Sequence, residues 1–300
     1  MINGKLIGKG KRSFVYSVKL NNRMVAVKIQ REDTAAQNIC EKEYRVLKEL
    51  NRHNIGPKVI KLKQNMLFME HIEGERITEF INKKGREEIL KIFEKLLKKL
   101  RKLDILGYSK KELTNPHKHI IISSGEPRLI DFERCTKTEK PNNITQFISF
   151  LTKSNIAETL LKKRIFLNKK RLRLLSARYK RSQSDKCFKA ILRHVCQQEF
   201  SQRVYCVTAL IPEGKVATYK QIADCLNTRG YRAVGNALNK NPYSPFLPCH
   251  RVIPSSGELG NFSKGIAKKL ELLKKEGVEI KNNRIDKRFI VAGIDSCDSC

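Results

Sequence analysis

Apolar and polar positions alternate in several short stretches near the start of the chain, a pattern typical of β-strands. One such stretch opens the sequence, and another covers residues 24–29, where valine and alanine dominate. Gly8 and Gly10 lie between them and suit a glycine-rich hairpin. Residues 41–47 then have the spacing of an amphipathic helix. The pattern predicts a strand-rich N-terminal region followed by a helix.

Helical periodicity dominates the second half of the chain. Gly230 separates the last two helical stretches, and two short helices joined by a glycine-containing turn are typical of a helix-turn-helix. Gly235 lies inside the second of these helices, where glycine is unfavourable, so we expect close packing or a close partner there. The predicted elements are helices at residues 188–198, 201–210, 219–226 and 232–238 and a short strand at residues 216–218.

Cys249 and His250 are adjacent in a short apolar stretch, residues 248–253, which begins with a proline and which we expect to be a strand. A cysteine reacts as its thiolate, and a neighbouring histidine that accepts the proton is a common way to activate it. The alternative is that Cys249 is one more buried thiol, since free cysteine often packs as a small apolar residue. These two residues alone favour neither interpretation.

Length and composition indicate the size of the protein and its chemical environment. A chain of 300 residues, 40% of them hydrophobic, can build two domains with separate cores. We expect a cytoplasmic protein with no membrane partner, because the sequence has neither a signal peptide nor an apolar run as long as a membrane span. Nine scattered cysteines favour reduced thiols. Cys297 and Cys300 have metal-like spacing, but a lone pair at the terminus favours a frayed tail over a zinc site.

Positive charge is the most unusual property of the composition, with a formal net charge of +32. Such a field attracts polyanions and supports binding to phosphate backbones. The charge is densest in residues 162–181, which contain many lysines and arginines and no acidic residue. We interpret residues 156–186 as a basic linker, with an additional phosphate-contacting arm as the alternative.

Six motifs follow one another in the last third of the chain in a characteristic order and spacing. They are residues 216–223 (VATYKQIA), 232–238 (RAVGNAL), 241–242 (NP), 248–253 (PCHRVI), 260–263 (GNFS) and 269–277 (KLELLKKEG). Together they resemble the O6-alkylguanine-DNA alkyltransferase family of DNA-repair methyltransferases. The resemblance covers residues 200–279, about a quarter of the chain.

The resemblance implies a suicidal methylated-DNA–protein-cysteine S-methyltransferase. Such an enzyme flips O6-alkylguanine out of double-stranded DNA and transfers the alkyl group once to Cys249, with no metal or other cofactor. O4-alkylthymine is a second candidate substrate. His250 would take the thiol proton and Glu276 would orient the imidazole ring. The remaining residues that the resemblance assigns are Asn241 and Tyr219 in catalysis, Phe262, Ser263 and Lys269 in the substrate pocket, and Arg232, Ala233, Gly235 and Tyr219 in DNA binding.

The first half carries a second set of motifs. A glycine-rich hairpin lets backbone N–H groups approach phosphates, and a lysine on the next strand, here Lys28, can pair with them. Glu43 on the predicted helix is placed to meet Lys28. Asp131 lies in an Ile-Asp-Phe run, at the place of the metal-binding Asp-Phe-Gly of kinases. In this order the motifs resemble a small archaeal protein-kinase-like domain. The resemblance implies binding of ATP by Gly8, Gly10, Lys28, Glu43 and Asp131, with Asp131 holding Mg²⁺.

The expected catalytic loop of this kinase-like half departs from the family pattern. Glu112 stands in the place of the catalytic aspartate, and His117 or His119 in the place of the metal-binding asparagine. Histidine is a poor ligand for Mg²⁺, which prefers oxygen. We therefore expect ATP binding with slow or absent serine/threonine-kinase activity. A degenerate kinase fold kept as a scaffold is the alternative.

These features predict a monomeric α+β protein of two domains. We expect a bilobal protein-kinase-like fold at residues 1–155, the basic linker at 156–186, a winged helix-turn-helix-like alkyltransferase domain at 187–285 and a tail at 286–300. One alternative function is an ATP-dependent kinase whose C-terminal half tethers it to DNA. Another is a module that recognises alkylated DNA without repairing it, but the presence of Cys249 beside His250 argues against this.

Overall fold

The computed structural model describes residues 4–197 and 199–294, and the chain forms two compact units of mixed helix and sheet. Unit 1 consists of Met1–Thr159 and Lys169–Leu192, and unit 2 consists of Leu160–Asn168 and Arg193–Cys300. The expected tail pair, Cys297 and Cys300, lies outside the described residues.

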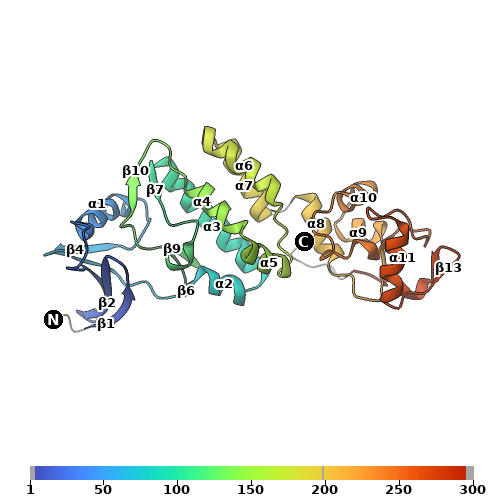
Figure 1. Ribbon diagram of the computed structural model, residues 1–300, viewed down its shortest axis with the longest axis horizontal. Helices are drawn as coiled ribbons and strands as arrows, with labels where there is room; N and C mark the ends of the chain where they lie inside the picture. Colours follow the sequence, from blue (N-terminus) through green and yellow to red (C-terminus); the bar gives the residue numbers. More distant parts are fainter. Residues whose placement is uncertain (1–3, 198, 295–300) are drawn as a thin grey trace. The chain divides into compact units, whose positions relative to one another are not determined.

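A five-stranded antiparallel sheet opens unit 1, with strand order β1-β2-β3-β5-β4 (Figure 1). Three successive apolar residues of β3, Val25, Ala26 and Val27, are all buried in the centre of this sheet. The helix α1 presents Leu47 and Leu50 from its buried face. The bounds are β1 (Lys5–Lys9), β2 (Ser13–Leu20), β3 (Arg23–Gln30), α1 (Ile39–Asn51), β4 (Val59–Lys63) and β5 (Met66–Glu70).

Helices form most of the rest of unit 1, arranged around α3 (Arg86–Ile105). Asp104, near the end of α3, is buried and accepts hydrogen bonds from the Asn143 side chain at 2.7 Å and from the Tyr179 hydroxyl at 2.8 Å. These bonds fix α4 and α6 against α3. The other elements are β6 (Glu75–Arg76), α2 (Ile77–Lys83), β7 (Tyr108–Lys110), η1 (Pro116–Lys118), β8 (Ile120–Ser123), β9 (Glu126–Leu129), β10 (Cys135–Lys137), α4 (Asn143–Leu151), α5 (Ser154–Lys162), α6 (Lys169–Ser182) and α7 (Asp185–Leu192).

The stretch expected to be a basic linker is largely folded. Leu172 and Tyr179 lie two helical turns apart on one face of α6, and both are fully buried. Their burial outweighs the repulsion among the surrounding lysines and arginines, because those long side chains extend into solvent from the other faces of the helix. Residues 169–192 therefore belong to unit 1, whereas residues 160–168 belong to unit 2.

Unit 2 contains the predicted pair of short helices, α9 and α10, after η2 and α8. The predicted boundaries at residues 219–226 and 232–238 agree with the observed helices to within a residue. The bounds are η2 (Arg193–Gln197), α8 (Phe200–Thr208), β11 (Ala217–Thr218), α9 (Tyr219–Cys225), α10 (Tyr231–Asn239), η3 (Cys249–Arg251), β12 (Val252–Ile253), α11 (Ile266–Lys275), β13 (Ile280–Lys281), β14 (Arg284–Ile285) and η4 (Lys287–Phe289).

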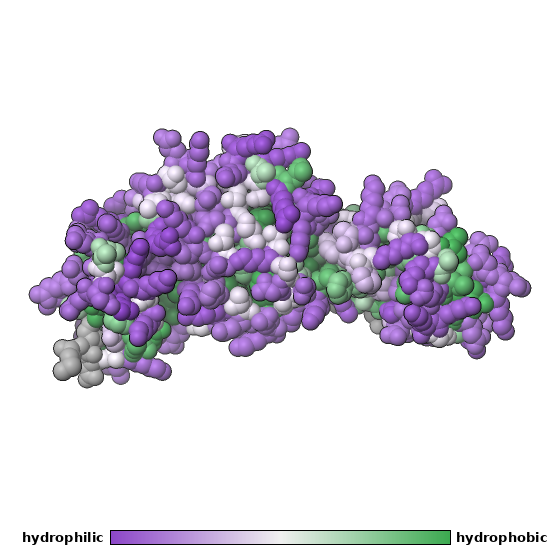
Figure 2. All heavy atoms as spheres, in the orientation of Figure 1, coloured by the Kyte–Doolittle hydropathy of each residue, from purple (hydrophilic) through white to green (hydrophobic). Residues whose placement is uncertain are grey.

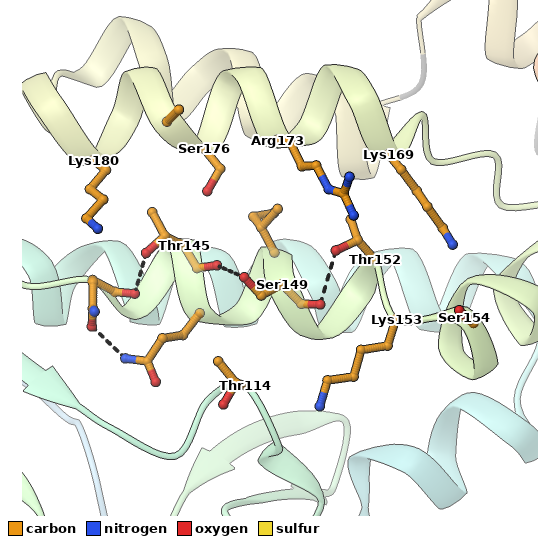
Figure 3. Close-up of a pocket in the computed structure, with 14 residues that line it drawn as sticks. Thr114, Thr145, Ser149, Thr152, Lys153, Ser154, Lys169, Arg173, Ser176 and Lys180 are labelled. Carbon is orange, nitrogen blue, oxygen red and sulfur yellow. Dashed lines mark hydrogen bonds between the residues drawn. The ribbon is translucent and has the colours of Figure 1, made fainter.

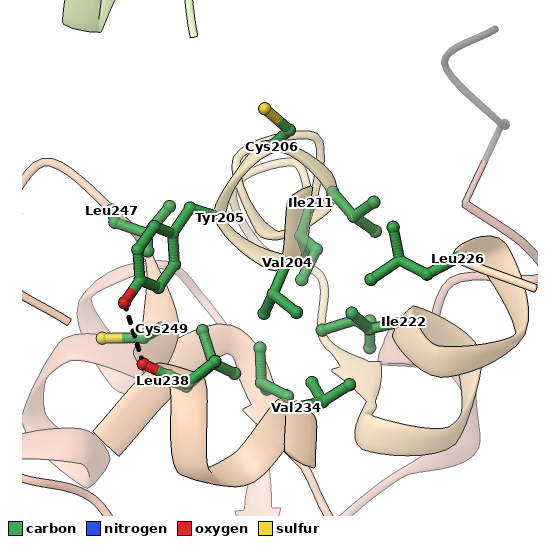
Figure 4. Close-up of a cluster of buried hydrophobic side chains, with 14 of the residues drawn as sticks. Val204, Tyr205, Cys206, Ile211, Ile222, Leu226, Val234, Leu238, Leu247 and Cys249 are labelled. Atoms are coloured by element: carbon green, nitrogen blue, oxygen red, sulfur yellow. Dashed lines mark hydrogen bonds between the residues drawn. The ribbon is translucent and has the colours of Figure 1, made fainter. Parts of the chain in front are cut away.

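The core of unit 2 includes a residue from outside the expected domain. Phe166 packs edge-on against Tyr205 and Tyr243, with ring centroids 5.7 and 5.1 Å apart. Figure 4 shows Tyr205 beside the apolar cluster formed by α8, α9 and α10, and its hydroxyl donates to the carbonyl oxygen of Ala237 at 3.0 Å. The apolar residues 165–167 are thus part of a folded core, although basic residues surround them in the sequence.

The expectation of a strand at residues 248–253 is correct only for its last two residues. Cys249–Arg251 forms a 3₁₀ turn, closed by a hydrogen bond from the Arg251 N–H to the Pro248 carbonyl oxygen at 3.0 Å. The turn keeps Cys249 and His250 off the sheet ladder, and only Val252–Ile253 pairs with β11.

Hydrophilic side chains cover most of the face shown in Figure 2, with apolar residues scattered among them. This agrees with the high density of lysine and arginine in the sequence. Over residues 4–197 and 199–294, no helix has the length and apolar character needed to cross a membrane.

We predict that Phe166→Ala destabilises unit 2 by about 3–5 kcal/mol, because it leaves a cavity between Tyr205 and Tyr243. Hydrogen exchange of the α8 amides in the full chain measures this change. Leu174→Ala is the control: this side chain is 55% exposed, so its removal should change stability by less than about 0.5 kcal/mol. Equal effects of the two variants would mean that Phe166 is not part of the unit 2 core.

Candidate active site

A two-residue parallel ladder brings the candidate reactive residues together. Thr218 pairs with Ile253, so the start of α9 lies beside the segment that carries Cys249 and His250. Thr218 also begins α9 with a capping box: its hydroxyl accepts from the Gln221 N–H at 3.1 Å, and the Gln221 side chain accepts from the Thr218 N–H at 2.8 Å. Tyr219 is therefore fixed at the first position of α9.

Cys249 is buried, with 8% of its surface exposed, and its sulfur has a polar neighbour. The Asn241 side-chain amide donates to Sγ at 3.5 Å, while the Asn241 Oδ1 accepts from the Tyr243 N–H at 2.8 Å. Asn241 thus holds the turn after α10 and touches the sulfur at the same time.

His250 is oriented by a carboxylate. Its Nε2 lies 2.7 Å from Glu276 Oε1 at the end of α11. Burial lowers the pKa of His250 and outweighs the opposing effect of Glu276, so the imidazole is neutral at pH 7 and able to accept a proton. The sequence places Glu276 26 residues away, and the structure brings it into direct contact.

Arg251 has a role that the sequence interpretation missed. Its guanidinium donates to both carboxylate oxygens of Glu276 at 2.8 Å and to the Ile211 carbonyl oxygen at 2.8 Å. Burial would raise the pKa of Glu276, but hydrogen bonds from Arg251 and His250 keep it below its usual value. The signal was the Cys-His-Arg triplet itself, since an arginine next to the histidine can reach the same carboxylate.

Lys269 is the most deeply buried charged group near Cys249, with none of its surface exposed. Its ammonium group donates to the Val252 carbonyl oxygen at 2.6 Å. Burial lowers the pKa of Lys269 to about 8, and attraction to Cys249 opposes this only in part. Burial of a charged lysine lowers the stability of the fold. Titratable groups with strongly shifted pKa values cluster at functional sites.

Four further residues of this site lie on α9 and α10. Tyr219 is half-buried, and burial, with a smaller contribution from Cys249, raises the pKa of its hydroxyl. Gly235 faces the Tyr219 ring: a Cβ on this glycine would lie 3.8 Å from the ring edge. Arg232 and Ala233 are exposed on the first turn of α10.

The two expected pocket residues before α11 have different environments. Phe262 packs against the apolar cluster that contains Cys249. Ser263 is exposed. The structure therefore packs Phe262 on the cluster that includes Cys249 but leaves Ser263 in solvent.

A second cluster of charge lies in unit 1 around Lys28. Its ammonium group contacts Glu43 at 2.6 Å, Asp131 at 2.8 Å and Glu133 at 3.3 Å. Burial alone would lower the pKa of Lys28, but Glu43 and Asp131 outweigh it and raise the pKa above its ordinary value. Lys28 is therefore a permanent cation, and the predicted contact with Glu43 is present.

Glu133 links the glycine-rich hairpin to the Lys28 cluster, although the sequence interpretation gave this residue no role. Gly8 lies in β1 and Gly10 in the turn that follows, where its N–H donates to the Ser13 carbonyl oxygen at 2.8 Å. Arg12 in the same turn pairs with Glu133 at 3.2 Å. Glu133 directly follows the Asp-Phe pair, so its position in the motif could have indicated a role.

The candidate catalytic loop is only partly in place. Glu112 lies 3.6 Å from Lys110 and 3.5 Å from Arg134, so two cations neutralise it. Of the two histidines, His119 is the one near Asp131, at 3.7 Å, whereas His117 is exposed. Burial lowers the pKa of His119 to about 4, which leaves the ring neutral.

The chemistry of this cluster fits a nucleotide and a hard cation. Asp131 offers carboxylate oxygens with 43% of its side chain exposed, and Lys28 offers a charge for phosphate. In the part of the chain that the structure describes, no three His, Cys, Asp or Glu residues are arranged to hold a metal by themselves. A cation here would therefore take further ligands from phosphate or water.

Comparison with known families agrees with both resemblances. Residues 16–172, more than half of the chain, match the RIO domain. The chain belongs to the RIO-domain family. Residues 199–278 match the DNA-binding domain of 6-O-methylguanine DNA methyltransferase, so the predicted combination of a kinase-like half and an alkyltransferase half is confirmed.

Individual curated relatives are similar to about a quarter of the chain. Methylated-DNA–protein-cysteine methyltransferase of Sulfolobus acidocaldarius is 53% identical over 81 residues, which are 27% of this chain and 51% of that protein. The same enzyme of Saccharolobus solfataricus is 57% identical over 70 residues, 23% of this chain and 45% of that protein. The chain thus spans about half the length of these curated relatives.

Two solved structures are similar to part of the chain. A Mycobacterium tuberculosis OGT in complex with DNA is 41% identical and covers 26% of this chain and 50% of its own, with a TM-score of 0.26. Schizosaccharomyces pombe Atl1, in complex with damaged DNA containing O6-carboxymethylguanine, is 31% identical and covers 31% of this chain and 94% of its own, with a TM-score of 0.29.

We predict that Lys269→Met stabilises unit 2 at pH 7, by up to about 3 kcal/mol, because it removes a buried ammonium group. The pKa of Lys269 is about 8 in the folded protein and 10.5 when unperturbed, so between these values the unfolded chain binds more protons. Wild-type stability should therefore rise relative to the variant as the pH increases from 8 to 10.5. Denaturant unfolding at several pH values measures this difference. A difference that stays constant with pH, or that also occurs for the exposed Lys268→Met, would contradict the prediction.

Proposed function

We propose that unit 2 repairs DNA by transferring the alkyl group of O6-alkylguanine to Cys249. The observation that carries this proposal is a pair of adjacent contacts. The Asn241 amide donates to the Cys249 sulfur, and the next residue, His250, is hydrogen-bonded to Glu276. A buried thiol, a neutral base and a carboxylate that orients the base are the parts needed to make a thiolate nucleophile.

The transfer balances without a cofactor. The thiol proton passes to His250, in the family pattern through a water molecule, and Glu276 and Arg251 stabilise the imidazolium that results. The Cys249 sulfur then forms a bond to the alkyl carbon as the bond from that carbon to O6 breaks. Tyr219 donates its proton to the departing guanine, and its raised pKa keeps this proton in place until then. No group in this scheme removes the alkyl from sulfur, so each chain acts once.

The proposal includes extrusion of the damaged base, because O6 inside a duplex is out of reach of a buried thiol. Arg232 and Ala233, exposed at the start of α10, would contact the DNA, and Arg232 would fill the space left by the flipped base. Gly235 lets Tyr219 lie close to α10. We assign α9 and α10 to a winged helix-turn-helix, with Phe262 and Lys269 beside the base pocket; the exposed Ser263 would reach it only with DNA bound.

We predict that incubation with O6-methylguanine duplex DNA adds one methyl group per chain, located on Cys249. Intact-mass analysis with peptide mapping detects this product. Cys249→Ser should remain unmodified, while Cys187→Ser in α7 of unit 1 should behave as the wild type. Repeated turnover by one chain, or tight lesion binding with no mass change, would contradict a single-use transferase; the second result would support recognition without repair.

We propose that unit 1 binds ATP with Mg²⁺, with little or no kinase activity. Lys28 would contact the phosphates, Gly8 and Gly10 would let the hairpin backbone approach them, and Asp131 would hold the cation. Glu43 fixes Lys28 and also accepts from the Phe132 N–H at 2.7 Å, which ties α1 to the Asp-Phe segment. Phosphoryl transfer depends on a well-placed base, and the ion pairs of Glu112 with Lys110 and Arg134 make it a poor one. This favours nucleotide binding over phosphoryl transfer. The two halves of a bilobal kinase-like fold would meet at this cluster.

We predict that Lys28→Met and Asp131→Asn each weaken nucleotide affinity by about 10-fold or more, the effect of removing one charge-assisted hydrogen bond. Titration of the full chain with a fluorescent ATP analogue and Mg²⁺ measures it. Lys19→Ala, an exposed lysine of β2, is the matched control and should bind as the wild type. Rapid autophosphorylation that is lost in Glu112→Ala would instead show a working kinase whose base is Glu112.

A further inference from the structure

A groove in unit 1 has no role in either proposed activity. It measures about 800 Å³ and lies between α4, α6 and the loop at Thr114. All of its lining residues belong to unit 1.

One side of the groove is a row of cations on α6. Lys169, Arg173 and Lys180 line the groove together with Ser176, at intervals of four, three and four residues that place them on one helical face. Figure 3 shows Arg173, Ser176 and Lys180 extending from α6 toward α4. Within the described residues, no carboxylate pairs with Lys169, Arg173 or Lys180, and none lines the groove.

The other side is a row of hydroxyl groups on α4. Thr145, Ser149 and Thr152 donate to carbonyl oxygens of their own helix, with Ser149 reaching the Thr145 oxygen at 3.0 Å and Thr152 the Ser149 oxygen at 3.1 Å (Figure 3). A hydroxyl can rotate and donate to a ligand instead. Lys153, at the end of the row, adds a fourth cation and donates to the Asn115 side chain.

The position of α6 is fixed independently of these cations. Leu172 and Tyr179 anchor the adjacent face of α6, and the Tyr179 hydroxyl binds Asp104 on α3. The cationic face is therefore held in place before any ligand arrives, which lowers the entropic cost of binding.

We propose that this groove binds the phosphodiester backbone of a nucleic acid. Lys169 and Lys180 are eleven residues apart, so the cationic row extends about 16 Å along the helix. A single phosphate is too short to use this length, whereas successive phosphates of one DNA strand advance about 3.4 Å along the duplex axis. A groove lined by cations and hydroxyl groups, with no carboxylate, suits phosphate oxygens. Contacts to phosphates fix the position of a nucleic acid but do not read its base sequence.

A pair of triple variants in the full chain tests the proposal with equal loss of charge. Lys169→Ala/Arg173→Ala/Lys180→Ala removes the groove cations, and Lys170→Ala/Arg178→Ala/Arg181→Ala removes three exposed cations of α6 outside the groove. We expect the groove variant to reduce the salt dependence of binding to undamaged duplex DNA. Its slope of log affinity against log salt should be smaller by about 0.9 for each phosphate that the variant no longer neutralises. The control variant should keep the wild-type slope. Equal changes in both variants would overturn the proposal, since they would reflect net charge alone.

Lysine acetylation of the unmodified chain provides a second readout that does not depend on how the variants fold. Undamaged duplex DNA should slow the acetylation of Lys169 and Lys180 while Lys170, their neighbour outside the groove, reacts at its original rate. The same protection should occur in Cys249→Ser, because the groove does not depend on alkyl transfer. Protection of all three lysines alike, or protection by a phosphopeptide or inorganic phosphate but not by DNA, would overturn the assignment to a nucleic-acid backbone.

Discussion

A charge that leaves water must find a partner, and this constraint determines the chemistry of both halves of the protein. Lys28 and Lys269 are both buried lysines, yet their pKa values move in opposite directions. Lys28 meets three carboxylates and stays charged, as a group that binds phosphate should. Lys269 meets one carbonyl oxygen, and its pKa falls to about 8. The partner, rather than the residue type, decides what each lysine can do.

The same constraint explains how Glu276 supports His250. A carboxylate shared between a half-buried arginine and a histidine remains ionised, because Arg251 pairs with it from one side. Glu276 can then orient the imidazole ring without taking its proton. Arg251 thus stabilises the base indirectly, and its contact with the Ile211 carbonyl oxygen links this ion pair to the loop before β11.

Contiguous motifs made much of the candidate site predictable. Cys249 and His250 are neighbours in the sequence, and the Lys28–Glu43 contact follows from a strand and a helix that lie close together along the chain. The role of Phe166 was not predictable in this way, because its partners Tyr205 and Tyr243 are distant in sequence and its own neighbours are basic. The 3₁₀ turn at Cys249 was missed because β12 has only two residues, too few to show a period. The apolar residues of the basic stretch indicated a partly helical segment, but the packing of α6 into unit 1 was not predicted, because its two buried residues are outnumbered by cations.

The path of the chain between the two units has a consequence for dissecting the protein. The chain passes from unit 1 to unit 2 before Leu160, returns before Lys169 and leaves again before Arg193. A single protease cut between residues 160 and 168 would give two fragments that each contain parts of both units. Neither fragment would be a complete domain. A clean separation requires a cut at each of the three crossings, and unit 1 would then consist of two pieces held together by packing alone.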